Sequence, residues 1–122
     1  MNIPKVSVIV LIYKVEKYIE RCARSLFCQT MQDIEYIFVN DCTLDCSIQI
    51  LQSVIDEYPQ RKSDIKIISH EKNMGSGAAR NTGLEAAGGE YVIYCDGDDW
   101  VDPDMYEKLY IKAREDNADT VS

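Results

Sequence analysis

A chain of 122 residues has the usual size of one domain and is long enough to bury a hydrophobic core. Hydrophobic residues make up 46% and charged residues 28% of it, and no run approaches the roughly 18 consecutive apolar residues of a membrane span, so we expect one soluble domain over residues 1–122. The formal net charge of −8 argues against a nucleic-acid partner, because binding a phosphate backbone takes clustered Lys and Arg.

Cysteine usage and the N-terminal residues favour a cytoplasmic protein. The five cysteines include no C-x-x-C pair, so they indicate neither a disulfide framework nor a zinc site, and a reducing compartment fits them best. Met1 is not followed by the basic segment and apolar core of a signal peptide. We therefore do not expect export.

The predicted elements alternate between strands and helices along the chain. The β-branched apolar run at 6–12 is typical of a strand covered on both faces, and apolar residues spaced three and four apart at 15–29 indicate an amphipathic helix. The remaining predicted elements are strands at 34–39, 65–69 and 91–95 and helices at 46–58, 78–87 and 103–117. Residues 118–122 resemble the start of a further strand, so we expect the sequence to be a truncated part of a longer chain.

This alternation predicts an α/β fold with a mostly parallel sheet and helices on both faces, as in Rossmann-like nucleotide-binding domains. In such sheets, ligands bind beyond the carboxyl ends of the strands. The rule selects residues 13–14, 40–43 and 96–102 as candidate ligand-binding loops.

The strongest local signal is Asp96-Gly97-Asp98-Asp99, which places three carboxylates within four positions after a buried strand. Such crowding of like charges costs free energy unless a cation compensates it. Mg²⁺ and Mn²⁺ take oxygen ligands and would also bridge to a diphosphate, so Asp96 and Asp98 are candidate metal ligands. A solvated acidic turn explains the spacing equally well, because Asp and Gly are common turn residues.

Asp41 follows the second predicted strand. A carboxylate at this place can accept hydrogen bonds from a base N–H or a ribose hydroxyl. Taken alone, an Asx turn or a helix cap is the more common interpretation of such a residue. For Asp45, we expect no more than a helix cap.

A glycine turn, small residues and Arg80 lie together at 73–81, where the arginine is placed to reach a phosphate or a carboxylate. The segment matches neither the G-x-G-x-x-G fingerprint nor a P-loop, so it is weak evidence by itself. Tyr13 and Trp100 are candidates for stacking on a base or sugar, or for ordinary packing. His70 is the only histidine, and a lone histidine after a strand is more often structural or solvated than catalytic.

Five motifs in the right order resemble the family 2 glycosyltransferases of the GT-A fold, the inverting bacterial enzymes that build polysaccharides and lipopolysaccharide. They are the opening strand with Tyr13, the first helix ending near Gln29-Thr30, the V-N-D-C-T-L-D loop at 39–45, the segment from N-M-G to A-A-R-N-T-G at 73–83, and the G-E-Y strand leading to D-G-D-D at 89–99. Each motif alone is weak, but the complete ordered set is strong.

The resemblance implies that Asp41 binds the uracil or other base, Asp96 the ribose or the metal, and Asp98 the metal bridging the diphosphate, and that Arg80 supports the nucleotide pocket. Tyr13 is a further candidate for nucleotide binding. The implied function is transfer of a sugar from a nucleotide-diphosphate sugar, expected to be a UDP-sugar, to a carbohydrate or lipid-linked acceptor hydroxyl in cell-surface polysaccharide synthesis. The implied cofactor is Mn²⁺ or Mg²⁺. Peripheral association of the full-length protein with the inner face of the cell membrane, and homodimer formation, are further hypotheses.

The chain departs from the family pattern in three respects. The family usually has Pro or Thr and then Tyr-Asn near the end of its first strand, where this chain has Leu11-Ile12-Tyr13-Lys14. Asn40 stands in place of Asp, and Cys42 in place of Gly. The general base of the family is a carboxylate in the acceptor-binding half, so we expect it beyond residue 122 and do not expect this chain alone to be a complete catalyst.

Two other function classes share this element order. A nucleotidyltransferase would normally carry a glycine-rich loop with Arg and Lys after the first strand, and no glycine follows Tyr13 here. A non-catalytic module of the receiver type would need an acidic pair after that strand, which is also missing. Comparing the binding of UDP, CTP and phosphodonors would separate a nucleotide-binding module from these alternatives.

Overall fold

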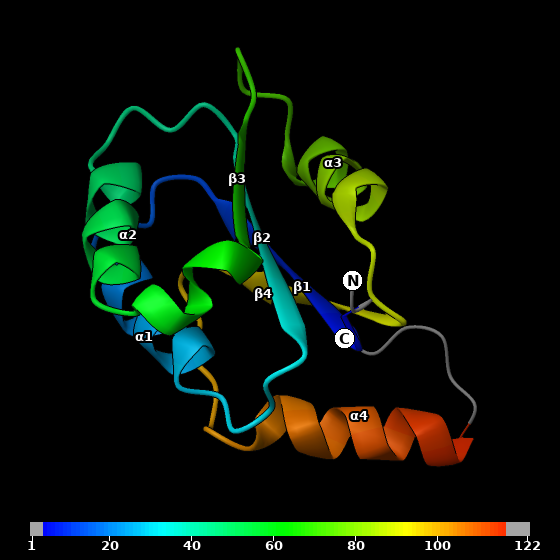
Figure 1. Cartoon of the computed structure of the whole chain (residues 1–122). Helices are drawn as coiled ribbons and strands as arrows, with labels where there is room; N and C mark the ends of the chain where they lie inside the picture. Colours follow the sequence, from blue (N-terminus) through cyan, green and yellow to red (C-terminus); the bar gives the residue numbers. More distant parts are fainter. Residues whose placement is uncertain (1–3, 117–122) are drawn as a thin grey trace.

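The computed structural model describes residues 4–116 and contains the predicted alternation of strands and helices (Figure 1). The strands are β1 (Val6–Ile12), β2 (Ile34–Asn40), β3 (Ile65–Ser69) and β4 (Tyr91–Asp96). The helices are α1 (Ile19–Phe27), α2 (Ser47–Asp56), α3 (Ser76–Ala86) and α4 (Met105–Asp116), with a 3₁₀ helix, η1 (Pro59–Asp64), before β3. The further strand that we expected at 118–122 lies outside the described residues.

The strands form one parallel sheet in the order β3-β2-β1-β4. β1 is central, with Ile12 paired to Asn40 of β2 and Leu11 paired to Asp96 of β4. The carboxyl ends of β1, β2 and β4 are therefore aligned at one edge of the sheet. This register brings the segments after β2 and β4 to either side of the end of β1.

Helices cover both faces of the sheet, as the sequence predicts. Alternate β1 residues, including Val8 and Val10, belong to the larger hydrophobic core with α1, α2 and Tyr106 of α4. Ile9 points to the opposite face and packs in a smaller core with Ala79 of α3. The α/β fold with a parallel sheet and two covered faces is thereby confirmed (Figure 1).

Helix α1 begins at Ile19, four residues later than the apolar spacing predicts. The N–H groups of Tyr18 and Ile19 both donate to the Val15 carbonyl, at 2.9 and 2.8 Å, and form a turn before the helix. The Val15 N–H itself donates to Ser47 Oγ at 3.1 Å. Val15 is thus a core residue of the loop after β1, where its backbone is tied to the start of α2.

The 3₁₀ helix η1 is not predicted by the hydrophobic pattern of the sequence. α2 ends at Asp56 instead of continuing to residue 58, and Pro59 opens η1. Arg61 of η1 is buried, and its guanidinium donates to the carbonyls of Phe27 (3.2 Å), Gln29 (2.7 Å) and Met31 (3.0 Å). It satisfies one carbonyl at the end of α1 and two in the segment between α1 and β2.

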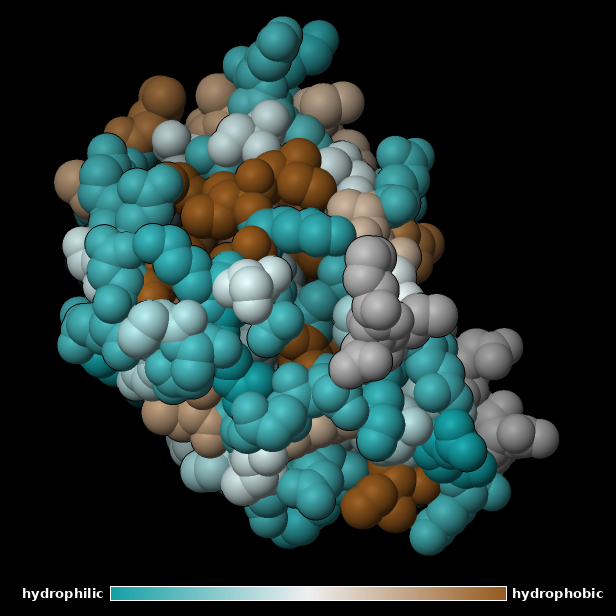
Figure 2. All heavy atoms as spheres, in the orientation of Figure 1, coloured by the Kyte–Doolittle hydropathy of each residue, from teal (hydrophilic) through white to brown (hydrophobic). Residues whose placement is uncertain are grey.

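The face of the molecule seen in Figure 1 is mainly hydrophilic, with an apolar patch between α2 and the edge strand β3 (Figure 2). Ile48 of α2 and Ile65 and Ile67 of β3 are partly buried side chains at the margin of the larger core. Within residues 4–116, none of the helices has the length and apolar character that crossing a membrane requires.

Candidate functional site

The loops after β1 and β2 are held together by side-chain oxygens. The Lys14 N–H donates to Thr43 Oγ1 at 2.9 Å, and the Glu16 N–H donates to Asp45 Oδ2 at 3.3 Å. Asp45 Oδ1 accepts the Ser47 N–H at 3.1 Å, so Asp45 contacts the first residue of α2. The N-cap position itself is Cys46, and Asp45 also bonds the loop after β1, so its role is wider than the simple cap that we expected. Burial acts to raise the pKa of Asp45, but its hydrogen bonds outweigh burial and hold the pKa below its usual value.

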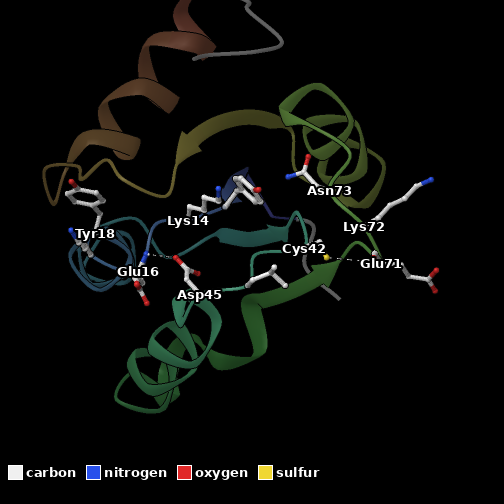
Figure 3. A pocket seen from close by; sticks show the side chains of 11 residues that line it. Lys14, Glu16, Tyr18, Cys42, Asp45, Glu71, Lys72 and Asn73 are labelled. Atoms are coloured by element: carbon white, nitrogen blue, oxygen red, sulfur yellow. Dashed lines mark hydrogen bonds between the residues drawn. The ribbon is translucent and has the colours of Figure 1, made fainter.

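A cleft of about 860 Å³ opens between the loops after β1, β2 and β3 (Figure 3). Tyr13 and Lys14 line it from the first loop, Cys42 from the second, and Lys72 and Asn73 from the third. Tyr13 is 41% exposed at this rim, and Lys14 Nζ lies 5.2 Å from its ring centre.

A smaller pocket of about 250 Å³ adjoins the cleft and shares Tyr13 and Asn73 with it. Its apolar lining comes from Leu11 and Ile12 of β1 and Ala79 of α3, and Asp41 contributes to its wall. A mostly apolar pocket with one carboxylate has the character expected of a site for a flat heterocycle that presents an N–H group.

The Asp41 carboxylate is anchored by three donors. Oδ1 accepts the Met74 N–H at 2.8 Å and lies 2.9 Å from His70 Nδ1, and Oδ2 accepts the Gly75 N–H at 2.9 Å. Burial acts to raise the pKa of Asp41, but the hydrogen bonds from His70 and the two amides outweigh it and lower the pKa. Asp41 is therefore held ionised at neutral pH, at the wall of the smaller pocket.

The contacts of Asp41 bear on both interpretations made from the sequence, a turn or cap residue and a base-binding residue. The carboxylate does bind backbone amides, those of Met74 and Gly75, which precede α3. It therefore holds the turn before that helix, where Gly75 has a φ of 92°, and does not bind the amides of the first helical turn as a cap would. It also lines a pocket. The structural role is shown by the contacts, and the base-binding role remains a proposal.

His70 is not solvated, and no sequence motif indicated its partners. Its side chain is 8% exposed and lies between two groups from distant segments, with Nδ1 at Asp41 and Nε2 2.8 Å from Thr82 Oγ1 of α3. The ring therefore connects α3 to the carboxylate after β2.

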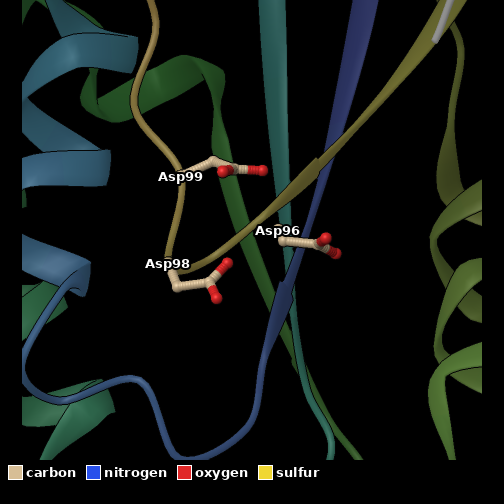
Figure 4. A group of neighbouring side chains, drawn as sticks. All are labelled: Asp96, Asp98 and Asp99. Carbon is tan, nitrogen blue, oxygen red and sulfur yellow. The ribbon is translucent and has the colours of Figure 1, made fainter.

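The acidic cluster lies at the carboxyl end of β4 (Figure 4). Asp96 is the last residue of the strand, and Asp98 and Asp99 project from the loop that follows. Each of the three is exposed, and one carboxylate oxygen from each lies within 4.8 Å of the others. Three converging hard oxygen donors fit a divalent cation such as Mg²⁺ or Mn²⁺, and the open face leaves room for ligand oxygens.

Gly97 lets this acidic turn approach the end of β1. Its N–H donates to the Leu11 carbonyl at 3.0 Å, and the Asp99 N–H donates to the Asp96 carbonyl at 3.0 Å. A Cβ atom at position 97 would lie 2.8 Å from the Leu11 carbonyl oxygen and 3.0 Å from Val15 Cγ2. The backbone of the turn is therefore packed against β1. Only its acidic side chains are solvated, as the alternative interpretation of a solvated acidic turn expects.

Arg80 and Trp100 lie at the periphery of these loops. Arg80 is exposed on α3, with its guanidinium 5.7 Å from the ring centre of Tyr94. Trp100 is 56% exposed, with the Arg21 guanidinium 5.8 Å from its ring centre. These contacts pair each side chain with a protein neighbour and do not test the predicted ligand contacts.

Comparison with known proteins places this arrangement in a family. Residues 7–122 match the family described as "Glycosyl transferase family 2". The chain is 44% identical to an uncharacterized glycosyltransferase, EpsJ, of Bacillus subtilis, over 98% of this chain and 33% of that protein. It is 42% identical to the cholesterol galactosyltransferase of Borreliella burgdorferi, over 96% of this chain and 31% of that protein.

The fold is also found in solved structures. The S. aureus protein TarS in complex with UDP-GlcNAc superposes with a TM-score of 0.81 at 32% identity, over 91% of this chain and 31% of that one. TarS has also been solved with UDP. The chain spans about a third of the length of the relatives that it matches.

Proposed function

Because this chain belongs to the family 2 glycosyltransferases, we propose that it binds the donor for sugar transfer, a nucleotide-diphosphate sugar of the UDP type. The full-length protein would transfer the sugar to a carbohydrate or lipid-linked acceptor hydroxyl in cell-surface polysaccharide synthesis. Residues 1–122 would form the donor-binding part, and the general base would lie in the acceptor-binding part of the full-length protein.

The observation that carries this proposal is the placement of two carboxylate sites at one sheet edge. Asp41 follows β2 and Asp96 ends β4, with β1 between these strands. Two strand spacings separate β2 from β4, or about 10 Å, which is within the length of a nucleoside diphosphate. A ligand that puts its base in the pocket beside Asp41 can extend its phosphates toward Asp96, Asp98 and Asp99.

The residues have distinct proposed roles. Asp41 accepts an N–H of the base, Tyr13 stacks on it, and Arg80 supports the nucleotide pocket. Asp96 and Asp98 hold Mn²⁺ or Mg²⁺ beside the diphosphate, with Asp96 also near enough to the sheet edge to serve the ribose. The bound cation would supply the positive charge that an acidic domain lacks for binding a diphosphate.

TarS supports the choice of uridine, because its complexes contain UDP and UDP-GlcNAc and its sequence is 32% identical over 91% of this chain. Calorimetric titration of UDP with Mn²⁺, with Mg²⁺ and with EDTA tests the metal-dependent site. We expect binding in the presence of either metal and its loss in EDTA, and equal affinity in all three conditions would contradict the proposed metal bridge.

A pair of substitutions separates the metal site from general surface charge. Asp98→Asn should weaken Mn²⁺-dependent UDP binding by about tenfold or more, the scale for losing a charged partner. Asp102→Asn makes the same chemical change four residues away, outside the cluster, and should leave UDP binding within about twofold of the unmodified chain. Equal losses in both variants would assign the effect to net charge.

A further inference from the structure

His70 links three segments that converge on the smaller pocket. It follows β3, and its N–H donates to the Asn40 carbonyl at 2.8 Å, which extends the β2–β3 ladder and fixes the position of the ring. Its Nδ1 lies against Asp41 and its Nε2 against Thr82. A buried ring with both nitrogens engaged has little freedom to change its orientation.

The hydrogen-bond partners of His70 show that its Nδ1 carries a proton. Ionised Asp41 has no proton to donate, so Nδ1 carries an N–H that donates to Oδ1. Thr82 Oγ1 satisfies Nε2 in either protonation state, because its hydroxyl can donate to the ring, or accept from it while donating to the Ala78 carbonyl at 3.0 Å. The pair of contacts therefore holds Nδ1–H toward Asp41.

The hydrogen bonds of Asp41 leave one acceptor position of its carboxylate for a ligand. An ionised carboxylate accepts about four hydrogen bonds, two at each oxygen. Oδ1 is filled by His70 and the Met74 amide, while Oδ2 accepts only the Gly75 amide among the contacts of the described residues. One acceptor position on Oδ2 remains, and Asp41 lines the smaller pocket.

We propose that His70 is a positioning residue for base recognition. Together with Thr82, it fixes the Asp41 carboxylate so that one acceptor position of Oδ2 meets the ligand. Such a position accepts the N3–H of uracil and rejects cytosine, whose N3 is itself an acceptor. Thr82 and His70 thus contribute to the choice of nucleotide without touching it. This inference rests on the proposed donor binding at Asp41.

The test measures the dissociation constants of UDP and CDP in Mn²⁺ by calorimetry. His70→Leu removes the donor, and we expect UDP affinity to fall about 3- to 10-fold and the UDP/CDP preference to fall with it. His70→Asn keeps an N–H near the Nδ1 position and should recover most of the preference. A merely structural histidine would lower stability but leave the UDP/CDP ratio unchanged.

Thr82 gives a matched pair of variants that leaves His70 in place. Thr82→Val keeps the shape and removes the hydroxyl, so we expect a smaller loss of UDP/CDP preference, about 2- to 5-fold. Thr82→Ser keeps the hydroxyl and should retain the preference. If His70→Leu does not fold, the contrast between these two variants decides the question.

Asp41→Ala distinguishes failure of this inference from failure of the proposed function. If the unmodified chain binds neither UDP nor CDP in Mn²⁺, the donor site itself is wrong. If the chain prefers UDP and Asp41→Ala abolishes the preference, while the His70 and Thr82 variants keep it, then donor binding stands and the positioning role is overturned.

Discussion

Replacing Gly97 by alanine tests whether the acidic turn depends on its close packing against β1. The added methyl group would lie 2.8 Å from the Leu11 carbonyl oxygen and 3.0 Å from Val15 Cγ2. Leu11 belongs to the central strand and pairs with Asp96, so its carbonyl has little room to move. Gly97 lacks a positive φ, so its requirement is for space and not for an unusual backbone conformation.

The contact distances set the expected size of the effect. Overpacking of this kind typically costs about 1–3 kcal/mol. If the turn moves away to relieve the contact, the hydrogen bond from the Gly97 N–H to Leu11 is weakened, which adds about 1 kcal/mol. Because the turn carries Asp96, Asp98 and Asp99, the same movement should weaken Mn²⁺ binding.

Gly77→Ala is the matched control, because it makes the same chemical change in α3. A Cβ atom at position 77 meets nothing within 4 Å, so alanine should stabilise the helix by about 0.5–1 kcal/mol. Urea unfolding and Mn²⁺ titration of both variants measure the two effects. Should Gly97→Ala match the unmodified chain in stability and Mn²⁺ affinity, the packing account of the turn is wrong.

Three further predictions address the buried polar network and one strained residue. Ser7→Ala removes the hydrogen bond that Ser7 donates to Glu35 Oε2 (2.6 Å) and the one that it accepts from the Gly89 N–H (2.7 Å). In urea unfolding, the free energy of unfolding should fall by about 2–4 kcal/mol. Replacing the exposed Ser53 by alanine should change it by less than about 0.5 kcal/mol. Burial acts to raise the pKa of Glu35, but its hydrogen bonds and Lys66 outweigh burial and lower the pKa below the usual 4.5. Ionised Glu35 therefore stabilises the fold above about pH 4.5, and this stabilisation is lost as the pH falls through the folded-state pKa. Acid unfolding, followed by circular dichroism, should be less steep in Glu35→Gln. Cys42→Gly should stabilise the chain by about 0.5–1 kcal/mol in thermal unfolding, because Cys42 has a φ of 59°, whereas Cys28→Gly, at a φ of −92°, should destabilise it.

The order of elements could be predicted because hydrophobic periodicity reports burial directly. All four strands were predicted to within one residue at each end, since a strand buried on both faces leaves a continuous apolar run, as at Val6–Ile12. Helix starts were less accurate. Val15 is apolar because it packs in the core, but its neighbours form a turn tied to Ser47, a partner 32 residues away. Long-range contacts of this kind leave no local pattern.

The candidate site was predictable in part because it lies at the ends of the predicted strands. Asp41 and Asp98 follow strands and Asp96 ends one, and the parallel topology brings strand ends to one edge. The role of His70 could not be predicted, because its partners Asp41 and Thr82 are 29 and 12 residues away and neither spacing is a motif. One signal was present, namely that His70 is the residue directly after the strand paired with β2.

Two of the departures from the family pattern fall where the backbone conformation is unusual. Lys14 and Cys42 are the non-glycine residues with positive φ among the described residues, at 56° and 59°. The family has Asn and Gly at these positions, the two residue types that adopt the left-handed region most readily. Lys14 and Cys42 adopt this conformation at a higher free-energy cost than Asn or Gly would, and contacts between the two loops offset part of that cost. The Lys14 N–H donates to Thr43 Oγ1, and Asn40 Oδ1 accepts the Thr43 N–H at 2.9 Å. An Asn at position 40 supplies the same acceptor as Asp would, so Thr43 stays in place and holds the loop after β1 against the loop after β2.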